Sequence, residues 1–212
     1  MTTKHKIEFE CNCCDGEFED YVIMSTNEFG SSDLDCRPAE MMRSTMACWV
    51  HECPHCGYID DGEDEDDRWL RSFIGSEEYK ECEGIVFGND IAGKFYRYAL
   101  IQLKKNRFEE ACSNFLRAAW GCDDSGESGN AVKCRIKFLE VFDKLQDVDD
   151  NLSLTRVDVL RRVGEFNAVL EEYKKCKFGD DLMNQILEFQ KEKCVQKNTD
   201  CFTVGEVIDG KP

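Results

Sequence analysis

Histidine is scarce in this sequence of 212 residues. Only three occur, His5, His51 and His55, and all lie within the first 55 residues. The sequence also lacks a phosphate-loop motif and any motif that pairs a nucleophile with a base. Because most catalysis depends on such groups, we expect a protein that is not an enzyme.

Long apolar stretches are absent too. No run of about 18 or more apolar residues occurs, and the opening "MTTKHKIEFE" has no apolar centre of the kind that a signal peptide needs. We therefore expect a soluble, cytoplasmic protein that has no membrane partner.

Positive charge is scarce at the amino-terminal end. Residues 1–67 hold 18 acidic and 4 basic side chains, a net charge of −14, whereas residues 68–212 hold 26 and 23, a net charge of −3. Nucleic-acid affinity comes largely from Lys and Arg that neutralise phosphates, so this balance disfavours a nucleic-acid partner. The change in charge predicts two domains, 1–67 and 68–212.

Cysteine, by contrast, is abundant, with 14 residues. Seven lie in the first 56 residues, and the other seven are spread singly along the rest of the chain. A reducing compartment disfavours a disulfide framework. We therefore interpret the clustered cysteines as metal ligands or redox groups, and the scattered ones as small core residues.

Two Cys-x-x-Cys pairs stand in the clustered part, Cys11 and Cys14 in "CNCCDG" and Cys53 and Cys56 in "CPHCGY". Each is followed by a glycine within two residues, which lets the backbone turn tightly. Two such turns bring four thiolates to about 2.3 Å from one zinc ion, in a tetrahedron. A shell of four thiolates leaves no position for a reactive water, so the sequence predicts zinc that folds the module.

The residues around the two pairs have the pattern of short strands: "KIEFE", "EFEDYVIMS", "ACWVHE" and "GYI". This layout is typical of the hairpins of a zinc ribbon. Residues 15–52, which separate the pairs, are more numerous than the roughly 15–20 of a compact ribbon. A long insertion between the two knuckles is therefore expected.

Other residues of this region remain open as ligands. Cys13 lies inside the first knuckle and is expected to point away from the metal, while His51 or His55 could replace a cysteine of the second. Cys36 and Cys48 are interpreted as packing groups, with a second thiol site as the alternative. These extra thiols also leave open a zinc- or redox-responsive regulator.

The insertion contains the two arginines of residues 1–67, Arg37 and Arg43. We expect both to form ion pairs with Asp33, Asp35 or Glu40; the alternative is that they bind an anion or a carboxylate of the helical part. If the protein is an enzyme, its pocket would lie at Arg37, Asp33 and Asp35.

Residues 60–67, "DDGEDEDD", lack the ligand spacing of a calcium loop. They are predicted to be a solvated linker whose last acids start a helix in "DRWLRSFI".

From residue 90 onward the apolar residues recur at helical spacing. Helices over 92–103 and 108–119, joined by "KKNR", have the large, small and aromatic positions of a tetratricopeptide hairpin. A second hairpin is predicted in "LTRVDVLRRVGEFNAVLEEYKKC", with further helices in "ESGNAVKCRIKFLEVFDKLQD" and "DDLMNQILEFQKEKCVQKN". The predicted fold is mainly α, with antiparallel tetratricopeptide-like hairpins and a small β zinc-ribbon module; an irregular helical bundle is the alternative.

Two segments, "DLDCRPAEMMRSTMACWVHECPHCGY" and "LRRVGEFNAVLEEY", resemble the bacterial family called domain of unknown function 2225. The resemblance covers nearly the whole chain. It implies paired cysteine knuckles with Cys11, Cys14, Cys53 and Cys56 as the metal site, followed by tetratricopeptide-like helices, and it implies no catalytic residue. The first knuckle departs from the family's usual Cys-Pro-x-Cys.

Stacked helical hairpins usually offer a surface that binds peptides or proteins. The function expected from the sequence is therefore that of a non-enzymatic zinc-binding protein with a helical scaffold for a protein or peptide partner.

Overall fold

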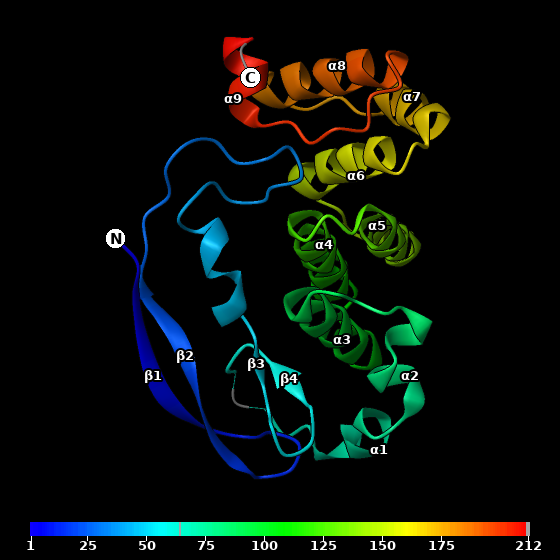
Figure 1. Ribbon diagram of the computed structural model, residues 1–212. Coiled ribbons are helices and arrows are strands. Elements are labelled where there is room, and N and C mark those ends of the chain that lie inside the picture. The colour runs from blue at the N-terminus through cyan, green and yellow to red at the C-terminus, as the bar shows by residue number, and fades with distance from the viewer. Residues whose placement is uncertain (64, 211–212) are drawn as a thin grey trace. The chain divides into compact units, whose positions relative to one another are not determined.

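The computed structural model describes residues 1–63 and 65–210 (Figure 1). These residues are mainly helical and include two small antiparallel sheets of two strands each. The predicted fold class, mainly α with a small β module, is confirmed. In the described part of the chain, every helix is too short or too polar to cross a membrane.

The chain forms two compact units, and each unit combines segments that are distant in sequence. Unit 1 contains residues 1–27 and 44–142, and unit 2 contains residues 28–43 and the chain from residue 143 onward. These units differ from the two domains, 1–67 and 68–212, that the sequence predicts, and those domains stay a prediction. The knuckles and the first long helices belong together in unit 1.

Unit 1 begins with an antiparallel hairpin and continues into helices. The ring of Phe9 stacks on Phe18, its cross-strand partner, with ring centroids 5.5 Å apart, and lies 4.3 Å from the ring of His51. These contacts join the two small sheets. The elements of unit 1 are β1 (Thr3–Glu10), β2 (Glu17–Ser25), most of the 3-10 helix η1 (Arg43–Cys48), β3 (His51–Glu52), β4 (Ile59–Asp60), η2 (Arg68–Leu70), α1 (Arg71–Ile74), α2 (Glu77–Lys80), η3 (Cys82–Gly84), α3 (Asp90–Lys104), α4 (Phe108–Asp124) and α5 (Ser128–Phe142).

The strand expected over residues 47–52 is shorter than predicted. Only its last two residues are in β3, and Cys48 ends the 3-10 helix η1. The indole of Trp49 donates a hydrogen bond to the Thr45 hydroxyl (2.8 Å), and its backbone N–H donates to the Met46 carbonyl (3.1 Å). Bonds between residues three and four apart favour a helical turn, and they outweigh the strand propensity of this segment.

Helices α3 and α4 form the predicted hairpin, and α5 packs on α4 (Figure 1). Small residues let the first two helices approach closely: a Cβ on Gly121 would lie 3.1 Å from the backbone of Ala92. Aromatic rings fill the space between them, and Tyr96 and Phe115 meet edge to face at 5.0 Å. The alternation of small and aromatic residues therefore works as the sequence predicts, while the repeat type stays a prediction.

The acidic segment after the second knuckle is not simply a solvated linker. Asp67 is buried, and it accepts hydrogen bonds from the Tyr58 hydroxyl and from Lys105 Nζ (2.8 Å). Glu65 pairs with Arg107 at 2.5 Å. Both bases lie at the turn after α3, so the acids hold the segment against that turn; residue 64 of the segment lies outside the described residues. Buried polar groups are tolerated when hydrogen bonds of this kind satisfy them.

Unit 2 consists of the insertion and the carboxy-terminal helices. Residue Asp33 pairs with Thr203 in an isolated β-bridge, and the Leu34 N–H donates to the Phe202 carbonyl (2.9 Å). The chain turns at Gly164, where φ is +85°. Its helices are α6 (Asp150–Arg162), α7 (Phe166–Lys175), α8 (Asp181–Val195) and α9 (Val204–Asp209).

Ion pairs hold the insertion in place. Arg43 pairs with Asp33 at 2.6 Å, which confirms the ion pair predicted for this arginine. Asp35 pairs with Arg162 of α6 at 3.0 Å, and the Asp35 side chain is fully buried. The backbone N–H of Arg37 donates to Asp35 Oδ1 (3.3 Å), and the Arg37 side chain is buried. Asp33 and Asp35, which the sequence offers as pocket residues of an enzyme, therefore each bind an arginine.

The scattered cysteines pack as small core residues in most cases. Five of the seven are buried: Cys82, Cys112, Cys122, Cys134 and Cys194. The other two differ, because Cys176 is half-buried and Cys201 is exposed.

Candidate metal centre

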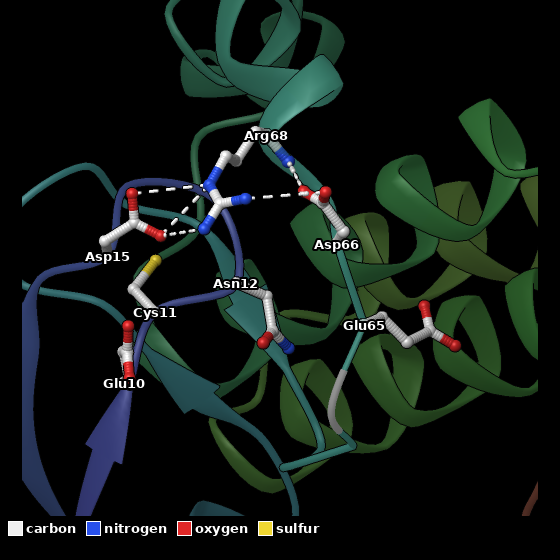
Figure 2. Close-up of a pocket in the computed structure, with 7 residues that line it drawn as sticks. All are labelled: Glu10, Cys11, Asn12, Asp15, Glu65, Asp66 and Arg68. Carbon is white, nitrogen blue, oxygen red and sulfur yellow. Dashed lines mark hydrogen bonds and ion pairs between the residues drawn. The ribbon is translucent and has the colours of Figure 1, made fainter.

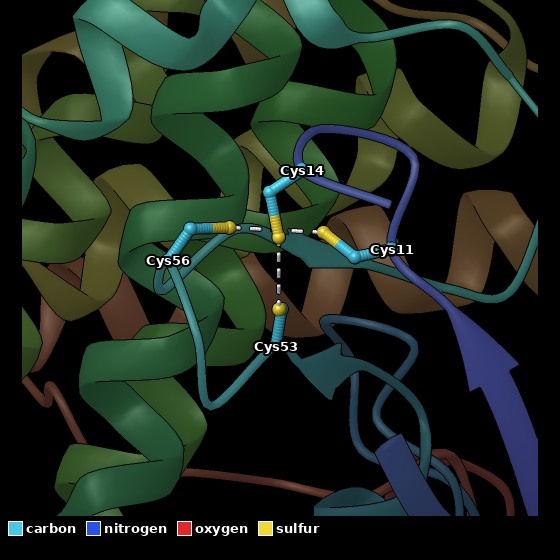
Figure 3. Close-up of side chains that lie close together, drawn as sticks. All are labelled: Cys11, Cys14, Cys53 and Cys56. Atoms are coloured by element: carbon cyan, nitrogen blue, oxygen red, sulfur yellow. Dashed lines mark hydrogen bonds between the residues drawn. The ribbon is translucent and has the colours of Figure 1, made fainter. Parts of the chain in front are cut away.

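The four cysteines of the two Cys-x-x-Cys pairs lie together in unit 1 (Figure 3). Their sulfur atoms all lie within 4.8 Å of one another, although the two pairs are about forty positions apart in sequence. Sγ of Cys11 is 3.7 Å from Sγ of Cys56, and Sγ of Cys14 is 3.7 Å from Sγ of Cys53. The structure thus brings together the set of residues that the sequence predicts as one site.

The two knuckles have the same backbone hydrogen bonds. In the first, the Asp15 N–H donates to the Cys11 carbonyl (2.9 Å), and the Cys11 N–H donates to the Gly16 carbonyl (3.0 Å). In the second, the Gly57 N–H donates to the Cys53 carbonyl and the Cys53 N–H to the Tyr58 carbonyl, both at 2.8 Å. Each turn presents two thiols on one side, so the site has two equivalent halves.

The two glycines of the knuckles serve different purposes. Gly57 has a φ of +79°, a conformation that glycine adopts without strain. The equivalent position of the first knuckle is Asp15, with a φ of +59°, and short polar side chains such as Asp tolerate that region. Gly16, one residue later, is needed for space: a Cβ there would lie 2.5 Å from Cδ2 of His55 and 3.3 Å from Sγ of Cys14.

Residues outside the knuckles hold them in position. The hydroxyl of Tyr79, a buried residue of α2, donates to the Gly57 carbonyl (2.6 Å), and the Asp67 N–H donates to the Asn12 carbonyl (3.1 Å). Glu52, just before the second knuckle, pairs with Arg97 of α3 at 2.5 Å. The centre is therefore fastened to the helices of its own unit. Sequence reasoning missed these supports, because nothing in the spacing of Tyr79 or Arg97 links either residue to a knuckle.

The thiols are not equivalent electrostatically. Burial raises the pKa of the Cys11 thiol to about 12, and burial also raises the pKa of Cys56. For Cys14, burial raises the pKa, but hydrogen bonds from the Gly16 backbone and from neighbouring thiols outweigh it, so the pKa is lowered. A bound cation would replace the thiol protons, since thiolates are the metal ligands.

The other candidate ligands of this unit have different surroundings. Cys13 is buried, as an inward-facing packing residue would be, and burial raises its pKa; it is not one of the four clustered thiols. Nδ1 of the buried His51 lies 3.0 Å from Asp20 Oδ2. Nε2 of His55 lies 2.9 Å from the Glu17 carbonyl. Both imidazoles therefore contact residues of β2.

Cys36 and Cys48 lie in different units. Cys36 belongs to the insertion, and its sulfur is 3.5 Å from the hydroxyl of Thr155 in α6. Cys48 is half-buried at the end of η1 in unit 1. Neither cysteine is one of the four clustered thiols.

A hollow of about 200 Å³ lies beside the first knuckle (Figure 2). The guanidinium of Arg68 crosses it, pairing with Asp15 at 2.6 Å and with Asp66 at 3.5 Å. Both acids and the arginine are largely exposed, so these pairs contribute little stability. The lining residues are Glu10, Cys11, Asn12, Asp15, Glu65, Asp66 and Arg68.

The donor set fits a metal ion that prefers four sulfur ligands. With metal–sulfur bonds of about 2.3 Å in a tetrahedron, neighbouring sulfurs are about 3.8 Å apart. The two separations of 3.7 Å agree with that value. The four cysteines can therefore hold one metal ion, and they would fill a tetrahedral shell.

Comparison with known proteins adds no relative. The chain matches no protein-family model, and searches of the curated proteins and of the solved structures found no similar protein. The resemblance to the domain of unknown function 2225 family stays a prediction.

Proposed function

We propose that this protein is a non-enzymatic zinc protein, in which Cys11, Cys14, Cys53 and Cys56 bind one Zn²⁺. The observation that carries this proposal is the approach of four sulfur atoms from two similar turns to within 4.8 Å. Four sulfurs in a tetrahedral arrangement are typical of zinc or iron sites. Zinc is favoured here because the role that the site supports is structural, and zinc brings no redox chemistry of its own.

The proposed role of the ion is to fasten the fold. Four thiolates complete the coordination shell, so no ligand position is left for a substrate or a reactive water. The ion would connect the residues before the insertion with those after it. The second knuckle is also bonded to the helices. Tyr79 of α2 donates to the Gly57 carbonyl, and Glu52 pairs with Arg97 of α3, so the ion would also stabilise the positions of α2 and α3.

The helices are proposed to serve as a scaffold for a protein or peptide partner. α3 packs on α4 and α4 on α5, and helical repeats of this kind usually bind other proteins. The net charge of −17 favours a partner surface that is basic and disfavours nucleic acid. Affinity enrichment with the full-length protein tests this part, and recovery of no specific partner would count against it.

Metal analysis of the purified full-length protein tests the zinc proposal. We expect one zinc per chain by mass spectrometry of the elements. Replacement of Cys56 by Ser should abolish stoichiometric zinc, because three thiolates bind far more weakly. The matched control is Cys13→Ser, in the other knuckle, which should leave zinc content unchanged. Iron in place of zinc, or zinc that survives Cys56→Ser, would contradict the proposal.

A second candidate function is that of a redox-responsive regulator. The observation that favours it is the half-buried Cys14, whose pKa is lowered and whose sulfur lies 3.7 Å from that of Cys53. Hydrogen peroxide could oxidise these two thiolates to a disulfide, being itself reduced to water, with release of the zinc ion. Zinc retained in peroxide, measured with a colorimetric chelator, would rule this candidate out.

A further inference from the structure

A second hollow in unit 1, of about 290 Å³, lies away from the four thiols. Its lining comes from three parts of the unit: Asp61 after β4, Tyr98 of α3, and residues 109–117 of α4. The α4 residues include two carboxylates, Glu109 and Glu110, and one guanidinium, that of Arg117. The hollow therefore carries both signs of charge.

Arg117 is the unusual residue of this hollow. Its guanidinium carbon lies 5.6 Å from the ring centre of Trp49 and 6.0 Å from that of Phe95. Burial lowers its pKa, and the opposite effects of Tyr98 and of the Asp61 carboxylate offset only part of this, so the charged form lacks some of the solvation that an exposed arginine has. Within the described residues, no carboxylate forms an ion pair with it, and its one hydrogen bond is from Nη1 to Asn114 Oδ1 (3.0 Å).

The other arginines of comparable burial in unit 1 have acidic partners. Arg97 pairs with Glu52 at 2.5 Å, and Arg135 pairs with Asp123 at 2.5 Å. A guanidinium has five N–H donors arranged to bind a carboxylate with two parallel hydrogen bonds. The Arg117 guanidinium also lies within cation–π range of two aromatic rings, which favours its charged form beside the hollow.

The acids of the hollow narrow the class of ligand. Asp61, Glu109 and Glu110 give the lining three negative charges against the one positive charge of Arg117. A phosphate or a simple carboxylate would meet the repulsion of all three. A ligand that also carries a positive group would bind both sets of charges and meet no net repulsion.

We propose that this hollow binds a small zwitterion, with its carboxylate on Arg117 and its primary ammonium group among Asp61, Glu109 and Glu110. The volume of about 290 Å³ is at the small end for ligand sites, which suits a molecule the size of an amino acid. This inference is independent of the zinc proposal, because it uses none of the four thiols.

Isothermal titration calorimetry on the full-length, metal-loaded protein tests the proposal. The probes are glycine, β-alanine and γ-aminobutyrate, which hold an ammonium and a carboxylate at increasing separation. Acetate and methylamine carry one charge each. We expect saturable binding of at least one zwitterion, about tenfold or more tighter than either single-charge probe, because each charged contact adds its own hydrogen bonds.

Two variants locate the site. Arg117→Gln should weaken the zwitterion by about tenfold or more, since the paired donors are lost. Ser113→Phe, also in the lining, should block the hollow without changing its charge, and it keeps the test decisive if Arg117→Gln folds poorly. The control is Arg68→Gln, which removes an exposed arginine from the hollow beside the first knuckle and should leave binding unchanged.

Three results would overturn the inference. One is the absence of saturable binding by all three zwitterions. Another is acetate or methylamine binding as tightly as the best zwitterion, because one set of charges would then play no part. The third is zwitterion binding that both Arg117→Gln and Ser113→Phe leave unchanged, which would place the ligand elsewhere.

Discussion

The two units of this protein are held together by different chemistry. Unit 1 joins its distant segments at four thiols that lie within 4.8 Å of one another. Unit 2 joins its segments with ion pairs, such as that of the buried Asp35 with Arg162 at 3.0 Å. Thiols need a metal ion to become a strong link, whereas the ion pairs are complete in the chain itself. The two units should therefore unfold under different conditions.

Metal removal should change stability the most, and it should affect unit 1 but not unit 2. Structural zinc contributes about 10–16 kcal/mol to small zinc domains at pH 7, and a unit with its own apolar core depends on it less. We expect chelation to lower the free energy of unfolding of unit 1 by about 5–10 kcal/mol. Hydrogen exchange should then accelerate in residues 11–16 and 53–58 and stay unchanged in residues 28–43 and in α6.

The matched control for chelation is the Cys13→Ser variant without chelator, which should exchange like the native protein. Equal acceleration in both units after chelation would show that the metal supports the whole molecule, and the contrast between the units would be lost.

Truncation of Arg161 should have the next largest effect, and in the other unit. This arginine is fully buried; it pairs with Asp158 (2.6 Å) and donates to Gln190 and to the carbonyls of Asn198 and Asp200. Arg161→Ala leaves the Asp158 charge buried without its partner. We expect a loss of about 3–5 kcal/mol in urea unfolding, followed by circular dichroism.

The control for this variant is Arg68→Ala in unit 1, where the arginine is exposed and its ion pairs are solvated. We expect a change below about 1 kcal/mol there. Zinc content should be the same in both variants. A change below about 1 kcal/mol for Arg161→Ala as well would mean that the buried hydrogen-bond network does not stabilise unit 2.

One half-buried acid of unit 1 differs from the buried acids of unit 2. Asp35 and Asp158 of unit 2 have arginine partners, whereas Asp60 of unit 1 accepts hydrogen bonds from the Gly62 N–H (2.9 Å) and the Asn12 amide (3.2 Å). Burial raises the pKa of Asp60 to about 6. Because that is above the unfolded value of roughly 3.9, the protonated carboxyl favours folding below about pH 4, and this contribution is lost as pH rises through about 6.

Replacement of Asp60 by Asn should therefore stabilise unit 1 at high pH. We expect a gain of about 1–2 kcal/mol at pH 8 that nearly disappears at about pH 4, where the carboxyl is protonated in the folded protein, since Asn carries no charge to bury. Urea unfolding at the two pH values measures the gain. Asp66→Asn, at an exposed acid of the same segment, should show no such trend. A gain of equal size at both pH values would mean that the charge of Asp60 is not its cause.

The smallest effects should come from the two equivalent knuckle positions. Gly57→Ala places a Cβ at a φ of +79°, which we expect to cost about 1 kcal/mol. Asp15→Gly relieves the same conformation but loses an exposed ion pair with Arg68, so we expect a change within about 0.5 kcal/mol. Thermal unfolding measures both. Equal losses in both variants would contradict the different roles of these residues.

The sequence predicted the four thiols well because Cys-x-x-Cys followed by a turn is a local pattern. It also predicted the hairpin of α3 and α4, since helical periodicity and the "KKNR" turn are local. It did not place residues 28–43 with the carboxy-terminal helices. That pairing depends on contacts such as Leu34 with Phe202, which join residues far apart in the chain and leave no periodic signal.

The partners of the acidic segment also depend on contacts between residues far apart in the chain. "DDGEDEDD" has the composition of a solvated linker. Composition does not show which bases lie nearby in the fold, and here Lys105 and Arg107, just after α3, pair with acids of this segment. In the knuckles, the glycine of "CNCCDG" was expected at the turn, but Asp15 occupies that conformation. The "DG" pair was the available signal, since Asp tolerates a positive φ.

X-ray absorption at the zinc edge of the purified full-length protein measures the ligands of the proposed zinc ion directly. We expect four sulfur neighbours at about 2.3 Å and no nitrogen or oxygen ligand. A shell that contains histidine nitrogen or water oxygen would contradict a centre of Cys11, Cys14, Cys53 and Cys56 that fastens the fold and performs no chemistry.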